Sequence, residues 1–199
     1  MAGAARLAFV LPPIIGPKLN DGSWNLYSAG IGGMGTGLPA GLGYYNPAQI
    51  FETNKHTTES DRIIGTLSAT LEPVKGLFIK TVYGMDNLSR ETTTFWSPIG
   101  GDGYSYGGYA YNWTGKDKRW TWTNTANYST TLVEKLNLAL LAGTEQQRTV
   151  GSSWNATKTA VSDPFFETFA GAWSTAYGVP GGGYGENYYA SYFGRVNLN

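Results

Sequence analysis

The sequence has 199 residues and no formal net charge, and only 14% of its residues are charged while 15% are aromatic. A typical soluble domain carries roughly 25% charged residues, so something other than charge is expected to cover the outside of this protein. The zero net charge gives no support for a nucleic-acid partner. The lack of cysteine excludes disulfides, thiolate metal sites and cysteine nucleophiles.

Residues 1–60 are predicted to be mostly loop. The apolar run at 7–11 is too short for the core of an export signal, and no window approaches the 18 apolar residues of a membrane-spanning helix. Residues 30–35 match the G-x-G-x-x-G pattern of dinucleotide sites, but the following Thr-Gly-Leu-Pro-Ala-Gly cannot begin the helix that such a site needs. No cofactor is therefore expected, and His56, in a polar stretch, is predicted to be a solvated loop residue.

Residues 61–199 contain five segments in which apolar and polar residues alternate, as in strands with two different faces. These segments are 63–71, 77–87, 119–129, 136–146 and 188–199. Four residues fall on the wrong face, namely Ile64, Asn124, Leu141 and Phe193. Strands of nine to twelve residues are longer than the roughly 5–6 usual in globular proteins and match the roughly 9–11 of a transmembrane β-strand.

The connections between these strands alternate between short and long. Residues 72–76 and 130–135 form short turns, whereas 88–118 and 147–187 form long loops rich in glycine and aromatic residues. This alternation is typical of outer-membrane barrels, in which short turns are periplasmic and long loops extracellular. The predicted loop 1–60 is likewise expected to be mostly extracellular. The predicted fold is therefore all-β, an antiparallel up-and-down meander of about five long strands that forms part of a barrel. Strands one, three and five would then be descending.

The loop around residues 95–113 is the main candidate for a binding site, because aromatic side chains are unusually dense there. Six of them are taken as candidate contacts to substrate or partner: Trp96, Tyr104, Tyr106, Tyr109, Tyr111 and Trp113. Exposed rings can anchor a ligand or another protein, although packing between loops explains the same residues. The scattered carboxylates show no pairing of the kind that a glycosidase needs, so no enzyme activity is predicted.

Distinctive stretches lie at 46–48 with 52–55, at 65–69 with 74–77, at 136–145 and at 191–197. In wording and order these stretches resemble the SusC/RagA family of TonB-dependent outer-membrane transporters of Bacteroidetes. The resemblance implies a nutrient importer for glycans or oligopeptides, partnered by outer-membrane lipid, a SusD-like surface lipoprotein and the TonB complex. No plug-like segment is recognised, so the chain is expected to be a fragment of the barrel wall of a longer protein in the bacterial outer membrane.

An alternative is a secreted β-sandwich that binds carbohydrate through the same aromatic loops. This alternative predicts strands of about six residues and connections that do not alternate between short and long.

Overall fold

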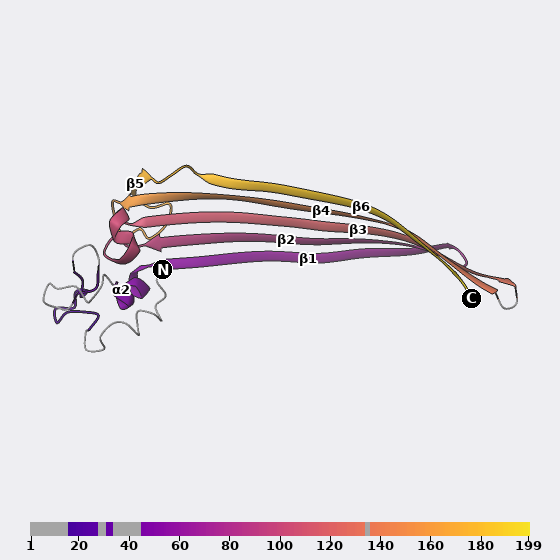
Figure 1. Cartoon of the computed structure of the whole chain (residues 1–199), viewed down its shortest axis with the longest axis horizontal. Coiled ribbons are helices and arrows are strands. Elements are labelled where there is room, and N and C mark those ends of the chain that lie inside the picture. The colour runs from indigo at the N-terminus through magenta and orange to yellow at the C-terminus, as the bar shows by residue number, and fades with distance from the viewer. Residues whose placement is uncertain (1–15, 28–30, 34–44, 134–135) are drawn as a thin grey trace. The chain divides into compact units, whose positions relative to one another are not determined.

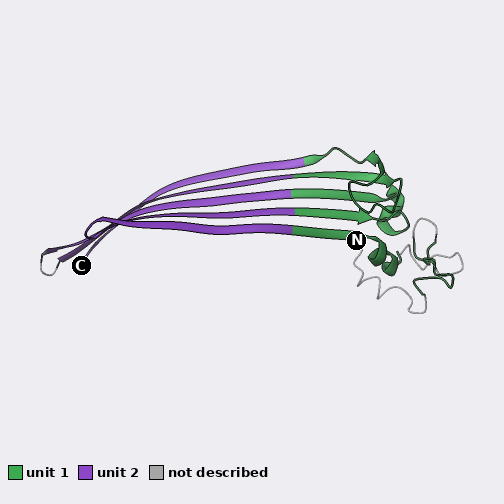
Figure 2. Cartoon of the chain, turned by 180° about the vertical axis from the view of Figure 1, so that it is seen from behind, with its two compact units in different colours: residues 1–59, 91–114, 154–181 green, residues 60–90, 115–153, 182–199 purple. Residues whose placement is uncertain are grey.

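The computed structural model describes residues 16–27, 31–33, 45–133 and 136–199. Two compact units, each built from three segments of the chain, are coloured in Figure 2. Unit 1 consists of residues 1–59, 91–114 and 154–181, and unit 2 consists of residues 60–90, 115–153 and 182–199. Because these segments alternate along the sequence, the long strands contribute residues to both units.

The described residues form one antiparallel, up-and-down sheet (Figure 1). Its strands are β1 (Lys55–Val74), β2 (Leu77–Trp96), β3 (Tyr109–Val133), β4 (Leu136–Val161), β5 (Trp173–Ala176) and β6 (Gly181–Leu198). The order in the sheet is β1-β2-β3-β4-β5, and β6 also pairs with β4. Five strands are long and β5 has four residues, so the predicted meander of about five long strands is confirmed. A single sheet of long strands contradicts the β-sandwich alternative.

The five long strands are about twice as long as the sequence predicted, with 18 to 26 residues each. As a result the predicted loop 88–118 shrinks to residues 97–108, and much of the predicted loop 147–187 is strand. The added segments lack a regular alternation, because some parts, such as residues 92–94, are polar on both faces and other parts carry aromatic residues on both. Their β-branched and aromatic residues nevertheless fit a paired strand.

The short connections agree with the sequence prediction where the structure describes them. β1 and β2 are joined by Lys75 and Gly76, and Gly76 has a φ of 87° that favours glycine. Its N–H donates to the Glu72 carboxylate at 3.0 Å. Of the connection 130–135, residues 134–135 lie outside the described residues.

The N-terminal part contains more regular structure than the predicted loop 1–60. The helix α2 spans Pro47–Thr53 and β1 begins at Lys55. In the glycine-rich stretch 30–35, Gly32 pairs with Leu26 in an antiparallel bridge, and the rest lies largely outside the described residues. No helix among the described residues is long and apolar enough to cross a membrane.

In unit 1, Asn46 holds α2 in place. Its side chain caps the helix by accepting from the Gln49 N–H at 3.2 Å, and Pro47 at the start of the helix needs no hydrogen-bond acceptor. The Asn46 amide also donates to the Pro17 and Asn25 carbonyls, at 2.7 and 3.4 Å. The stretch from Asn46 to Lys55 that carries part of the family resemblance therefore encodes a capped helix and the start of β1.

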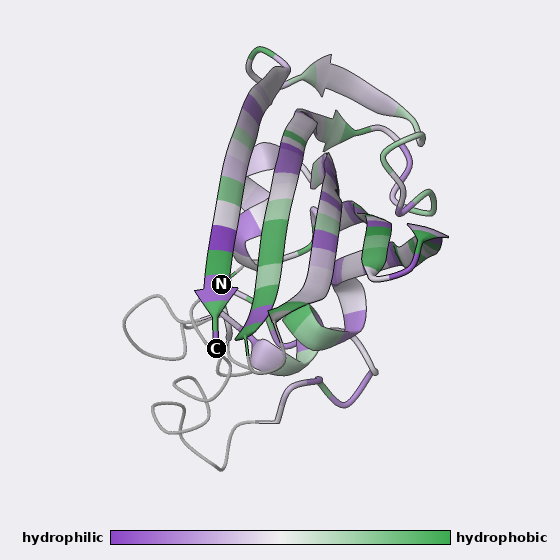
Figure 3. Cartoon of the chain, turned by 90° about the vertical axis from the view of Figure 1, so that its right-hand side faces the viewer, coloured by the Kyte–Doolittle hydropathy of each residue, from purple (hydrophilic) through white to green (hydrophobic). Residues whose placement is uncertain are grey.

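Unit 2 is a sheet with one polar and one apolar face. Figure 3 shows hydrophobic and hydrophilic residues as green and purple bands along the strands. On the polar face Arg62 forms a bidentate pair with Asp86, at 2.8 and 2.6 Å, and Thr123 donates to Glu145. The apolar face is exposed: Leu67 is 76% exposed. Among the described residues, the buried apolar side chains are Phe95 and Ala110, both in unit 1.

A cluster of three aromatic rings lies on the apolar face of unit 2. Trp120 stacks on Tyr83, with ring centres 6.1 Å apart, and meets the edge of Tyr188 at 6.3 Å. The three residues come from β2, β3 and β6, so the cluster runs across the strands. It is called the aromatic cluster below.

Candidate functional site

The predicted aromatic site corresponds to a hollow of about 240 Å³ in unit 1. His56 of β1, Thr94 and Trp96 of β2, and Tyr109 and Tyr111 of β3 line it. His56 and Thr94 share a hydrogen bond of 2.8 Å between Nδ1 and Oγ1. The wall of the hollow is therefore a strip across three neighbouring strands, which fixes the spacing of the rings. It is called the aromatic hollow below.

Four rings form a continuous series that begins at Trp96 and Tyr109 in the wall of the aromatic hollow. Trp96 stacks on Tyr109 with centres 4.4 Å apart and planes 22° apart. Tyr106 leans on Tyr109 at 5.7 Å and meets Tyr177 edge-on at 5.5 Å. Rings that support one another in this way are held rigid and lose little freedom when a ligand binds.

The short helix η2 (Gly101–Tyr106) sets the position of Tyr106. It ends at Gly107, whose φ of 62° favours glycine. Inside the helix Gly103 lies against the Ser97 carbonyl and Trp96 so closely that a Cβ would collide with both. The glycines that suggested a loop in the sequence are therefore needed for a tight turn that brings Tyr106 to the Trp96–Tyr109 stack.

The six predicted contact residues have different positions. Trp96, Tyr109 and Tyr111 line the aromatic hollow, and Tyr106 joins it through the ring series. Tyr104 is 46% exposed on η2, and Trp113 lies further along β3. Neither of these two lines the hollow.

Two residues at this site were not recognised in the sequence. His56 was predicted to be a solvated loop residue, but it is a strand residue in the wall of the aromatic hollow. Tyr177 extends the ring series from a segment about seventy positions away in the chain. No alternation in the sequence points to His56, because residues 55–62 are polar at every position. The hydrogen bond of 3.0 Å between Thr58 and Thr92 shows that this part of β1 lies beside β2.

The neighbouring Phe95 has a packing role. It is 3% exposed, and the edge of Trp173 meets its ring at 6.0 Å. Glu167, six residues before Trp173, forms an ion pair with Lys55 at the start of β1. This ion pair helps to hold the segment that contains Trp173. Ligand contact and loop packing, the two readings of the aromatic stretch, therefore apply to residues on opposite faces of the same strand.

Two tyrosine side chains of unit 1 have a raised pKa. The phenol of Tyr177 raises the pKa of Tyr106, with smaller contributions from burial, Tyr109 and Asp102. Burial, and then the Asp102 carboxylate, raise the pKa of Tyr45. Both phenols are therefore protonated at neutral pH. Among the described residues no three His, Cys, Asp or Glu side chains are grouped so that they could hold a metal ion.

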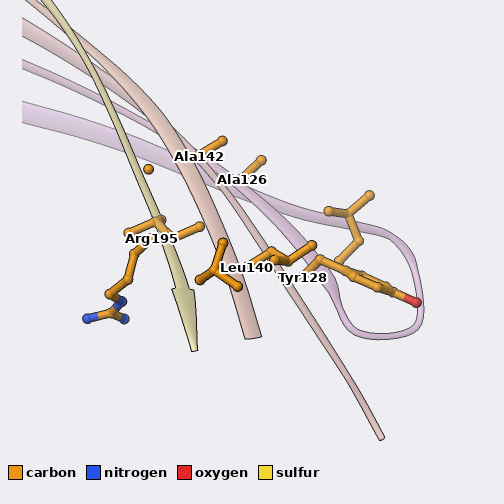
Figure 4. Close-up of a pocket in the computed structure, with 9 residues that line it drawn as sticks. Ala126, Tyr128, Leu140, Ala142 and Arg195 are labelled. Atoms are coloured by element: carbon orange, nitrogen blue, oxygen red, sulfur yellow. The ribbon is translucent and has the colours of Figure 1, made fainter. Parts of the chain in front are cut away.

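A second hollow, of about 380 Å³, lies in unit 2 and is almost wholly apolar. Figure 4 shows Ala126, Tyr128, Leu140 and Ala142 along its strands, with the side chain of Arg195 directed away from the Tyr128 ring. A specific ligand site needs a few polar groups that converge on the ligand. This hollow offers an apolar surface without them, unlike the aromatic hollow.

Comparison with known proteins supports the fold. No family model and no curated protein matches the chain. Among solved structures it is similar to the RagAB peptide importer in the 'open-open' state, with a TM-score of 0.71 and 21% identity, over 100% of this chain and 21% of that chain.

Two further structures give the same result over 92% of this chain and 20% of theirs. The RagAB peptide transporter has a TM-score of 0.69 at 24% identity, and the importer in the 'closed-closed' state has 0.68 at 23%. The chain spans about a fifth of the length of these neighbours. It has the fold of part of a RagAB importer chain, which confirms the resemblance to SusC/RagA transporters at the level of the fold.

Proposed function

We propose that the chain is a section of the barrel wall of an outer-membrane, TonB-dependent nutrient importer of the SusC/RagA type. The observation that carries the proposal is the likeness of the whole chain to a fifth of a RagAB importer chain. An open sheet supports it, because β1 ends the order of strands on one side and β6 pairs with β4 alone. Unpaired edges do not persist in hydrocarbon, so strands of a longer protein would pair with them.

The exposed apolar face of unit 2 supports a location in lipid. Trp120 and Tyr128 lie eight residues apart on this face of β3, roughly 26 Å along the strand. At a tilt of about 40° this gives about 20 Å of height, close to the roughly 25 Å apolar band that aromatic girdles flank in such barrels. The aromatic cluster would then mark one edge of the bilayer core.

In this arrangement the connections of unit 1 face the outside of the cell and the aromatic hollow contacts substrate or partner. An oligopeptide is the favoured substrate because the similar structures are described as peptide importers, and a glycan is the alternative. A SusD-like lipoprotein would cap these connections, and the TonB complex would supply energy through other parts of the full-length protein.

The role of the hollow can be tested with Trp96→Ala/Tyr109→Ala in outer-membrane vesicles, using pools of labelled oligopeptides and labelled oligosaccharides as probes. Losing two rings should weaken binding of the cognate pool by about 2 kcal/mol, or roughly 30-fold. The matched control is Phe165→Ala/Phe166→Ala, which removes two exposed rings, 82% and 50% exposed, outside the hollow.

Assembly of each variant is checked by resistance of the folded protein to proteolysis. Unchanged binding in an assembled hollow variant would remove the hollow from the mechanism. The pool that loses binding identifies the substrate class.

A further inference from the structure

Two exposed lysines follow the aromatic cluster along β3. Lys118 and Lys116 lie two and four residues from Trp120, so all three side chains share one face of the strand. The Trp120 ring is fixed on that face by Tyr83 and Tyr188. The lysines therefore begin where the apolar part of the face ends.

The charges of these lysines are not neutralised by the charged groups around them. Asp117, which lies between them, points to the other face and pairs with Arg90 at 3.1 Å. Glu186 is held by Arg148 at 2.7 Å and also accepts from Tyr184. In the part of the chain that the structure describes, neither lysine has an ion-pair partner. The two lysines therefore keep their positive charges, because both nearby carboxylates are already paired with arginines.

Strand geometry places the Lys118 backbone at the depth of the lipid headgroups and the Lys116 backbone just outside them, where a lysine stem can reach back. The two positions are roughly 7 and 13 Å from Trp120 along the strand, or about 5 and 10 Å in height at a tilt near 40°. The headgroup layer on each side of the hydrocarbon core is about 5–8 Å thick. The lysines lie toward the connection 97–108, which is longer than the turn Lys75–Gly76, and longer connections are extracellular in such barrels.

We propose that Lys116 and Lys118 bind the phosphate groups of lipids in the outer leaflet. The site rests on the proposed function, since it needs unit 2 to span the bilayer. The ammonium group is a compact charge with three donors that suits a phosphate oxygen, and its aliphatic stem can lie along the apolar face. The lysines, together with the aromatic cluster, would fix the depth of the sheet in the membrane.

The test measures partition of the full chain into two kinds of vesicle, pure phosphatidylcholine and phosphatidylcholine with lipid A, whose phosphates are the probe. Each lysine near an anionic surface contributes about fivefold in binding, so K116Q/K118Q should bind lipid A vesicles roughly 30-fold more weakly. K75Q/K80Q is the control, because it removes the same charge from the turn and from the opposite face of β2. K116R/K118R keeps the charge and should keep the binding.

The outcomes separate the two proposals. A lipid A preference that K116Q/K118Q loses and K75Q/K80Q retains supports the phosphate site. Equal binding to both vesicles, or equal losses in the two double variants, overturns the site while the membrane-spanning role stands. If the chain binds neither vesicle, the membrane-spanning role fails and the site fails with it.

Discussion

The assignment of the two faces of unit 2 predicts opposite effects for one substitution at adjacent positions. Leu71 lies on the apolar face of β1 and is 63% exposed, while Thr70 lies on the polar face and is also exposed. Because both side chains are exposed, an arginine at either position does not overpack a buried core. The difference in the free energy of unfolding between Leu71→Arg and Thr70→Arg therefore shows whether lipid or water surrounds each face.

The magnitude follows from the depth of Leu71. It lies four residues before Lys75, which is roughly 13 Å along the strand and about 10 Å in height at a tilt near 40°, close to the middle of an apolar band of about 25 Å. Arginine on the lipid face at the midplane costs about 2–4 kcal/mol, or roughly 30- to 1,000-fold in the folding equilibrium. Thr70→Arg should change the free energy of unfolding by only about 0.5 kcal/mol or less, the usual range for a surface substitution.

The assay is reversible urea unfolding of the full chain in phosphatidylcholine vesicles, followed by fluorescence of its 7 tryptophans. Leu71→Arg should lower the midpoint and Thr70→Arg should leave it nearly unchanged. A larger loss for Thr70→Arg would show that the polar face meets lipid. Equal, small effects would show that unit 2 does not lie in the bilayer, and would refute the reasoning.

Three further predictions concern unit 1. Asn46→Ala removes the helix cap and two hydrogen bonds to carbonyls, which should cost about 2–3 kcal/mol and speed hydrogen exchange of α2, whereas Asn46→Asp keeps the cap. Gly108→Ala should reduce thermal stability more than Gly178→Ala, because both have positive φ but a Cβ on Gly108 would lie 2.7 Å from Val161. The pKa of Tyr45 is raised above 10.0 in the folded protein. Its contribution to the free energy of unfolding should therefore be complete below pH 10 and be lost as the pH rises through the raised pKa, which phenolate absorbance during alkaline unfolding would show.

The apolar strand segments could be predicted from the sequence because the two faces of unit 2 have different surroundings. Residues such as Leu67 and Thr66 alternate, and alternation identifies a strand whose faces differ. Beyond the aromatic cluster the strands carry polar and aromatic residues on both faces, so they continue without a regular alternation of apolar and polar residues. Their ends depend on backbone pairing with neighbouring strands, which the sequence of one strand does not record.

The misplaced Phe193 shows another limit of the pattern. A Cβ on Gly143 would collide with its ring, so this glycine leaves the space that Phe193 occupies on the polar face. Phe193 and Gly143 are fifty residues apart in the chain. Their contact is a consequence of the register between β4 and β6, and alternation within β6 alone cannot predict it.

The region of the candidate site could be predicted, because the high density of aromatic residues is visible in the sequence without knowing how the strands pair. Separating Phe95 from Trp96 does need it, since neighbouring residues of a strand point to opposite faces. Phe95 packs against Trp173, while Trp96 stacks on Tyr109 in the wall of the aromatic hollow. Composition identified the stretch, and only the pairing of strands shows which rings can meet a ligand.

The low charge content and the exposed apolar face have one physical cause under the proposed function. In water, a sheet that exposes Leu67, Tyr192 and Val196 at 76%, 82% and 69% would form an apolar patch that favours aggregation. In a bilayer the same row is covered by lipid, and charge is needed only on the polar face and beyond the aromatic cluster. Arg62 with Asp86, and Lys116 and Lys118, occupy those two places. A sequence with 14% charged residues is therefore sufficient for a wall that lipid covers on one side.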